Sequence, residues 1–202
     1  MPHPSRPNRR SGFFSALIAL VLTLAIVPVA QAATPRNLDV TEGRAVAPQR
    51  YDVEKYILRL MNCIRTGGTL RADAGCTGYG SGNNGGYRAP YKLSKAASDR
   101  VARPYAKLLV SISECNHWFD GAPDYRLRRG GISFSNYGEN IGCRDGEKPF
   151  KSVLASMLHF QSEKSYNGWH WRNIKEPRLS HVGIGIWVSG TRIRFVTDFY
   201  RP

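Results

Sequence analysis

Two C-terminal segments rich in β-branched and aromatic residues restrict the fold of this chain more than any other feature. They are HVGIGIWV, residues 181–188, and RIRFVTDFY, residues 192–200. Only Ser189-Gly190-Thr191 separates them. Two such runs joined by a short link that contains glycine are typical of a β-hairpin. The sequence therefore predicts that the chain ends in a pair of adjacent antiparallel strands.

Amphipathic helices are predicted upstream of this hairpin. In residues 52–67 the apolar side chains recur at helical spacing, with Asp52 placed to cap the start and Gly67 to end the helix. A further helix begins at Pro149, since proline is favoured in the first turn. Helices early, strands late and short connections between them favour an α+β layered domain.

The helix predicted between these two contains a proline. Residues 93–117 show helical periodicity with Ser94 as the expected cap, but Pro104 removes one backbone donor. We therefore expect a kink or a break near Arg100. The glycine-rich segment 78–90 lacks the G-K-[ST] ending of a phosphate-binding loop, and we interpret it as a plain loop.

Residues 1–32 have the pattern of a secretory signal peptide. Arginines precede an apolar run at 13–30, and Ala30-Gln31-Ala32 supplies the small residues of a cleavage site. A membrane anchor is the alternative, but the run is short and contains Pro28. We expect a secreted, extracellular protein with no transmembrane span after cleavage, by a Sec or Tat route that the sequence leaves open. Residues 33–50 are predicted to be a flexible segment and residues 51–202 a single domain.

The chain is strongly basic, with a formal net charge of +14 at pH 7. Outside the cytoplasm this charge favours anionic partners such as lipid headgroups or cell-envelope polymers, and it indicates no specific nucleic acid. A solvated basic surface is the simpler interpretation and stays open. We expect a monomer.

Four cysteines in an exported chain indicate two disulfides, for which three pairings exist. Cys63 and Cys76 bracket a short glycine-containing turn, whereas Cys115 and Cys143 each lie near a candidate site residue. We therefore predict the pairs 63–76 and 115–143. A structural zinc site is the alternative, but the sequence has no C-x-x-C spacing.

Four residues with acid-base or ligand chemistry stand out. They are His117, Glu139 in the stretch GENI, Glu163 and His170. The remaining imidazoles of the mature chain have structural interpretations: His159 is expected to face solvent or a partner helix, and His181 to begin a strand.

Taken in order, these motifs resemble the CAP superfamily of cysteine-rich secretory proteins, antigen 5 and pathogenesis-related proteins, whose domain is also called SCP-like. The matching stretches are CNH, GENIGC, FQSE, GWHWRNI and HVGIGIW, spread over residues 52–200. The resemblance implies a three-layer α-β-α sandwich with a central antiparallel sheet, and a cleft that holds two histidines and two glutamates.

Carried over by motif, these cleft residues are His117, Glu139, Glu163 and His170, and we call them the cleft tetrad. The chain departs from the family pattern at Phe160, where tryptophan is usual, and its H-W-R-N-I follows the bacterial style.

A carboxylate in a cleft can orient a histidine by accepting one ring N–H, which leaves the other nitrogen free for a metal. We therefore predict that His117 and His170 bind a divalent transition metal such as Zn²⁺, with Glu139 orienting one ring. The 115–143 disulfide would join the two motifs that carry His117 and Glu139. The alternative is a tetrad that forms only a hydrogen-bonded core network.

The favoured function is a binding module, with no required cofactor, for a lipid, a small apolar ligand or a cell-envelope component. The alternative is a metal-dependent peptidase or peptidoglycan hydrolase with Glu139 or Glu163 as general base, although two imidazoles fall short of the three ligands usual at catalytic zinc. Adhesion to the cell surface through charge is a third hypothesis. Three arginines are expected to lie in a solvated loop: Arg126, Arg128 and Arg129. Three tryptophans are expected to pack near the cleft: Trp169, Trp171 and Trp187.

Overall fold

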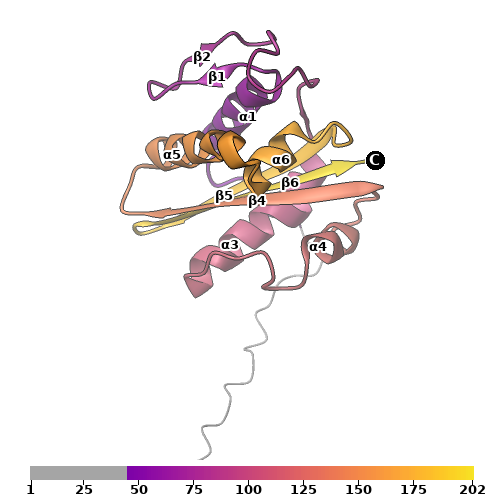
Figure 1. Cartoon of the computed structure of the whole chain (residues 1–202). Helices are drawn as coiled ribbons and strands as arrows, with labels where there is room; N and C mark the ends of the chain where they lie inside the picture. The colour runs from indigo at the N-terminus through magenta and orange to yellow at the C-terminus, as the bar shows by residue number, and fades with distance from the viewer. Residues whose placement is uncertain (1–44) are drawn as a thin grey trace, which may run out of the picture. The chain divides into compact units, whose positions relative to one another are not determined.

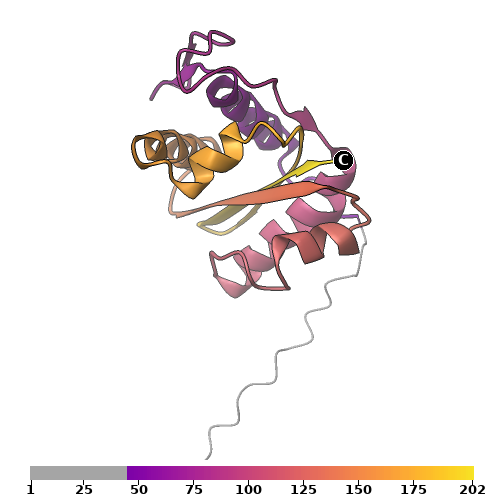
Figure 2. The same ribbon diagram turned by 45° about the vertical axis from the view of Figure 1, so that its right-hand side comes forward.

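Three layers make up the part of the chain described by the computed structural model, residues 45–202. A four-stranded sheet lies between two groups of helices (Figure 1). One face carries α1 (Tyr51–Arg65), α5 (Pro149–Ser162) and α6 (Trp169–Lys175), and the other carries α3 (Arg103–Ile112) and α4 (Pro123–Arg129) (Figures 1 and 2). The predicted α+β class and three-layer α-β-α arrangement are confirmed.

The strands of the central sheet lie in the order β3-β5-β6-β4. Their bounds are β3 (Lys92–Leu93), β4 (Asn136–Asp145), β5 (His181–Ser189) and β6 (Arg192–Arg201). The last two form the predicted terminal hairpin. The two-residue strand β3 runs parallel to β5, so the sheet is antiparallel except at this edge. The short strands β1 (Thr69–Leu70) and β2 (Cys76–Thr77) form a separate antiparallel pair.

The strand β4 places the GENI stretch at one edge of the sheet. It pairs antiparallel with β6 along its whole length, and Glu139 lies directly opposite Asp198. Side chains of residues that are directly opposite point to the same face of a sheet. Two acidic side chains from distant parts of the sequence are therefore neighbours on one face.

The predicted helix ends are confirmed in one case and wrong in another. The Ser94 hydroxyl accepts a hydrogen bond from the Ala97 amide at 3.2 Å, as a helix cap does. Asp52 does not cap α1, because the helix already begins at Tyr51 and the Asp52 carboxylate bonds the Arg50 guanidinium at 2.9 Å.

The second predicted helix is broken where Pro104 requires it. A short α2 (Lys95–Ala97) passes into a wide turn of π-helix, Ser98–Ala102, before α3 begins. Pro104 then lies in the first turn of α3, where its missing donor costs nothing.

Glycines in β5 let this helical segment approach the sheet. A Cβ at Gly183 would lie 2.6 Å from the Ala97 Cβ, and one at Gly185 would lie 2.3 Å from the Arg103 amide nitrogen. Both distances are shorter than packed atoms allow. The GIG spacing of β5 therefore permits close packing of the sheet against the α2–α3 segment.

The predicted signal peptide and most of the predicted flexible segment lie outside the described residues. Where that segment enters the structure it is bound to the domain: the Val46 amide donates to the Asp99 carbonyl at 2.8 Å. The Gln49 side chain also bonds both the amide and the carbonyl of Val188. Within residues 45–202, no helix has the length and apolar character needed to cross a bilayer.

Both predicted disulfides are present. Cys63 bonds Cys76 and Cys115 bonds Cys143, which uses all four cysteines of the chain. The first joins α1 to β2. The second joins the segment after α3 to β4, and therefore fastens the loop that carries His117 to the strand that carries Glu139.

Candidate functional site

The first half of the cleft tetrad is a histidine held by a buried glutamate. His117 lies in the loop after α3, and its Nδ1 is 2.7 Å from Oε1 of Glu139 on β4. The Glu139 side chain is 1% exposed and that of His117 is 36% exposed. Because a carboxylate only accepts, the hydrogen of a neutral His117 ring lies on Nδ1. Nε2 of His117 is then left with a free lone pair.

The second half repeats this arrangement with different elements. Glu163 directly follows α5, and its Oε1 lies 2.6 Å from Nδ1 of His170 in the first turn of α6. Oε2 of Glu163 accepts the His170 backbone amide at 2.9 Å. Burial raises the pKa of Glu163, but the His170 ring and the backbone amides hold the pKa below its usual value overall. The ring of Phe160 stacks on that of His170 with 4.2 Å between the ring centres, so Phe160 covers one face of this histidine.

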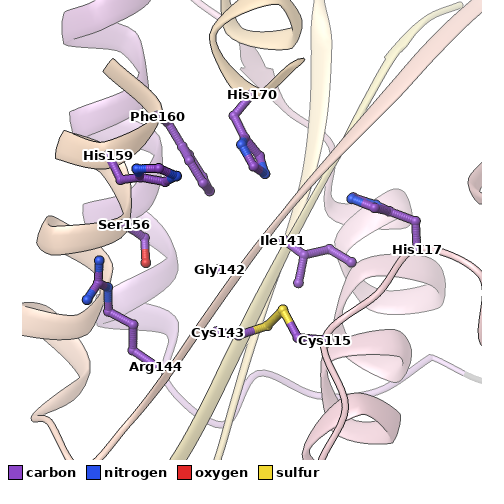
Figure 3. A pocket seen from close by; sticks show the side chains of 10 residues that line it. All are labelled: Cys115, His117, Ile141, Gly142, Cys143, Arg144, Ser156, His159, Phe160 and His170. Atoms are coloured by element: carbon purple, nitrogen blue, oxygen red, sulfur yellow. A yellow bond between two sulfur atoms is a disulfide. The ribbon is translucent and has the colours of Figure 1, made fainter. Parts of the chain in front are cut away.

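A cavity of about 360 Å³ separates the two pairs (Figure 3). His170 and Phe160 project from one wall, and His117 projects from the opposite wall with its ring turned toward the same space (Figure 3). The Cys115–Cys143 disulfide and Ile141 form part of the lining. The structure thus brings both predicted histidines to one cavity, each with its glutamate behind it.

The predicted position of Arg126 was wrong. We expected a solvated loop, but Arg126 lies in α4 with its side chain only 2% exposed. Its guanidinium donates to Oε2 of Glu139, to the His117 carbonyl at 2.9 Å and to the Phe119 carbonyl at 3.3 Å. Arg126 therefore balances the charge of Glu139 and holds the loop of His117 in place.

The signal that separates Arg126 from its neighbours is Pro123. A proline at this position favours the start of a helix, and successive residues of a helix are about 100° apart. Arg128 then points roughly 200° away from Arg126, and its side chain is 66% exposed. Arg129 pairs instead with Asp120.

Asp198 is a second residue that sequence analysis did not find. It is fully buried on β6, and neither carboxylate oxygen has a hydrogen-bond partner within residues 45–202. Burial raises its pKa well above the ordinary value, and the negative charge of Glu139 raises the pKa further. Asp198 therefore keeps its proton to a higher pH than an exposed aspartate. Only the register of β4 on β6 reveals that it lies beside the site.

His159 faces solvent, which was one of the two expectations for it, but it also belongs to the site. Its side chain is 56% exposed, yet it lines the cavity, and its Nε2 is 3.6 Å from Oε1 of Glu163. His159, Glu163 and His170 each offer one ligand atom, and these atoms lie within 4.8 Å of one another. The chain therefore has a His/Glu cluster that could hold a metal. His181 begins β5 as expected and bonds Ser180.

The fold of this chain is similar to those of solved structures. The crystal structure at 1.5 Å resolution of an extracellular protein that contains an SCP domain, from Bacillus anthracis, matches with a TM-score of 0.53 and 19% sequence identity. The match covers 75% of this chain and 41% of that protein. This chain has the CAP-superfamily fold. The structure of NaASP2 with Zn²⁺ matches with a TM-score of 0.48 and 12% identity, over 73% of this chain and 78% of that one.

No protein-family model matches the sequence, and a search of curated proteins also found no match. The similarity to the CAP superfamily therefore lies in short motifs and in the three-layer fold.

The three tryptophans expected near the cleft differ in how they pack. Trp169 is exposed, with the Arg172 guanidinium over its ring at 4.3 Å. Trp171 is buried in the core between the sheet and α1, and Trp187 packs on the α3 side. None of them is among the residues that line the described cavity. The aromatic wall of the cleft is Phe160.

Proposed function

We propose that this chain is an exported CAP-domain binding module that holds a divalent transition-metal ion between the imidazoles of His117 and His170. The observation that supports this most is the pairing of each Nδ1 with a buried carboxylate, at 2.7 Å and 2.6 Å. Metal-ligating histidines commonly donate their second ring N–H to a carboxylate, which fixes the ring and strengthens the ligand. Nε2 of each ring is then the expected ligand atom.

The donor set suits some ions and not others. Imidazole nitrogens are preferred by Zn²⁺ and Cu²⁺, whereas Ca²⁺ and Mg²⁺ need a shell of oxygen ligands. Both oxygens of Glu139 already bond protein groups, His117 and Arg126. A cavity of about 360 Å³ has room for water or a small ligand to complete the shell of the ion.

The partner in this proposal is a lipid, a small apolar ligand or an anionic component of the cell envelope. The predicted signal peptide supports an extracellular location, and the excess of lysine and arginine over acidic residues that remains after residue 32 supports attraction to anionic surfaces. Phe160 and Ile141 give the cavity an apolar wall beside its histidines.

A metal-dependent peptidase or peptidoglycan hydrolase is the second candidate. It is favoured by one observation, the presence of a third imidazole, that of His159, in the cavity lining. In this function Glu139 or Glu163 would serve as general base. Both carboxylates already accept hydrogen bonds from imidazoles, and Glu139 also bonds Arg126, which makes them poorer bases for a water molecule.

The proposal is tested by calorimetric titration of Zn²⁺ into the full chain at pH 7.5 and pH 5.5. We expect binding at the higher pH and weaker binding at the lower pH, because a protonated imidazole ring cannot coordinate a metal ion. The His117→Ala, His170→Ala double variant should release or absorb no heat from specific Zn²⁺ binding. Equal heats for this variant and the wild type would contradict the proposal and leave the tetrad as a hydrogen-bonded network.

A further inference from the structure

His159 occupies a position from which it can reach the proposed ion. It lies on α5 one helical turn before Glu163, and its ring centre is 6.1 Å from that of His170. Both rings line the same cavity, together on the wall opposite His117 (Figure 3). The CAP resemblance assigns no role to this position.

We propose that His159 is a third imidazole ligand of the ion in this cleft, on the same wall as His170 and with the Glu163 carboxylate beside both. The inference rests on the proposed function, that the cleft holds a transition metal, and it adds to that function a ligand that the tetrad lacks.

The spacing of the cluster suits a shared ion. Zinc–nitrogen bonds of about 2.0–2.1 Å place two imidazole ring centres on one tetrahedral ion roughly 5 Å apart. The ring centres of His159 and His170 are 6.1 Å apart, so one ring must move closer for both to bind one ion. One ligand atom from each of His159, Glu163 and His170 already lies within 4.8 Å of the others.

The two rings on this wall differ in how firmly they are held. Phe160 stacks on His170, with 12° between the ring planes, and Glu163 bonds its Nδ1, so this ring has a fixed position. The His159 side chain is more than half exposed, and its rotation disturbs no core packing. His170 is thus the rigid ligand, and His159 is the ligand that adjusts to the ion.

A third ligand changes the chemistry that the cleft can support. Three protein ligands with one open position are the usual set at catalytic zinc sites, whereas two hold an ion only weakly. With His159 the ion gains both affinity and a defined position for an exchangeable water or ligand. With His159, the cleft has the three protein ligands that are usual at the zinc site of a hydrolase.

The test uses Co²⁺ and Zn²⁺ as probes on the full chain. Wild type, His159→Ala and the control His181→Ala are compared by the visible absorption of bound Co²⁺ and by Zn²⁺ affinity in competition with a chelator. We expect His159→Ala to lower Zn²⁺ affinity by about tenfold or more and to weaken the Co²⁺ bands, because fewer protein ligands leave a more hydrated ion. His181→Ala, which removes a histidine outside the cavity lining, should behave as the wild type.

A thermal unfolding curve for each variant checks that the fold is retained, and His159→Gln provides a second substitution that keeps polarity and removes the ring. Wild-type affinity and an unchanged Co²⁺ spectrum in both His159 variants would overturn the third ligand while leaving the two-histidine site intact. A wild-type chain that takes up neither ion would overturn the proposed function itself.

Discussion

Glu139 depends on residues that are distant in sequence. One of its oxygens bonds His117 and the other bonds Arg126, while Asp198 lies opposite it on β6. A buried carboxylate without a compensating cation is costly, so the orientation of the His117 ring depends on Arg126 as much as on Glu139.

Arg126 and Arg128 make a matched pair for testing this dependence. We expect Arg126→Met to lower the free energy of unfolding by about 3–5 kcal/mol, because it leaves the buried Glu139 carboxylate without its cation. Arg128→Met, on the exposed side of the same helix, should change it by less than about 0.5 kcal/mol. Chemical denaturation of both variants provides the comparison. Similar losses in the two would mean that burial of the Arg126–Glu139 pair contributes little.

At the scale of elements, the two disulfides have different relations to the site. Cys115–Cys143 joins the loop of His117 to β4, whereas Cys63–Cys76 joins α1 to β2, neither of which carries a tetrad residue. Their sequence separations are 28 and 13 residues.

Removing each disulfide by paired alanine substitutions should therefore separate stability from site geometry. Loop-closure entropy predicts losses of about 3–4 kcal/mol for the longer loop and about 3 kcal/mol for the shorter. Only the Cys115→Ala, Cys143→Ala variant is expected to weaken Zn²⁺ binding as well, since it frees the His117 loop from β4. Unfolding curves and calorimetry measure the two effects. Equal Zn²⁺ affinities in the two variants would show that this disulfide does not position the site.

Elements with several turns or strong β patterns could be predicted from the sequence, and short ones could not. The terminal hairpin, α1, α5 and the break before α3 are confirmed. We did not predict α4 and α6, because helices of seven residues span only two turns and show little periodicity. We also assigned no strand to residues 136–145, where glycines and charged residues interrupt the apolar pattern.

The same limit applies to the site. The tetrad residues were predicted because they lie in motifs that resemble a known family. Arg126, His159 and Asp198 lie in no such motif. Arg126 and Asp198 reach the site only through tertiary structure, whereas His159 lies one helical turn before Glu163. Asp198 is the clearest case, since its neighbour Glu139 is set by the pairing of β4 with β6. Strand register between distant segments cannot be read from local periodicity.

At the scale of the molecule, the layered fold is what assembles the cavity. One wall comes from α5 and α6 on one face of the sheet, and the other comes from the loop after α3 and the edge strand β4. The CAP fold thus brings residues from four separate segments to one space. In this account the buried glutamates set the two facing histidines so that Nδ1 carries hydrogen and Nε2 is free.

Nitrogen-15 NMR of the imidazole rings, on the metal-free full chain near neutral pH, tests this claim most directly. Correlations from ring carbon-bound hydrogens to both ring nitrogens report which nitrogen is protonated. We predict that His117 and His170 carry hydrogen on Nδ1 and have a bare Nε2, because Glu139 and Glu163 accept from Nδ1 at 2.7 Å and 2.6 Å. Spectra in which both rings carry hydrogen on Nε2 would contradict the account, since neither ring would then present a lone pair to an ion in the cleft.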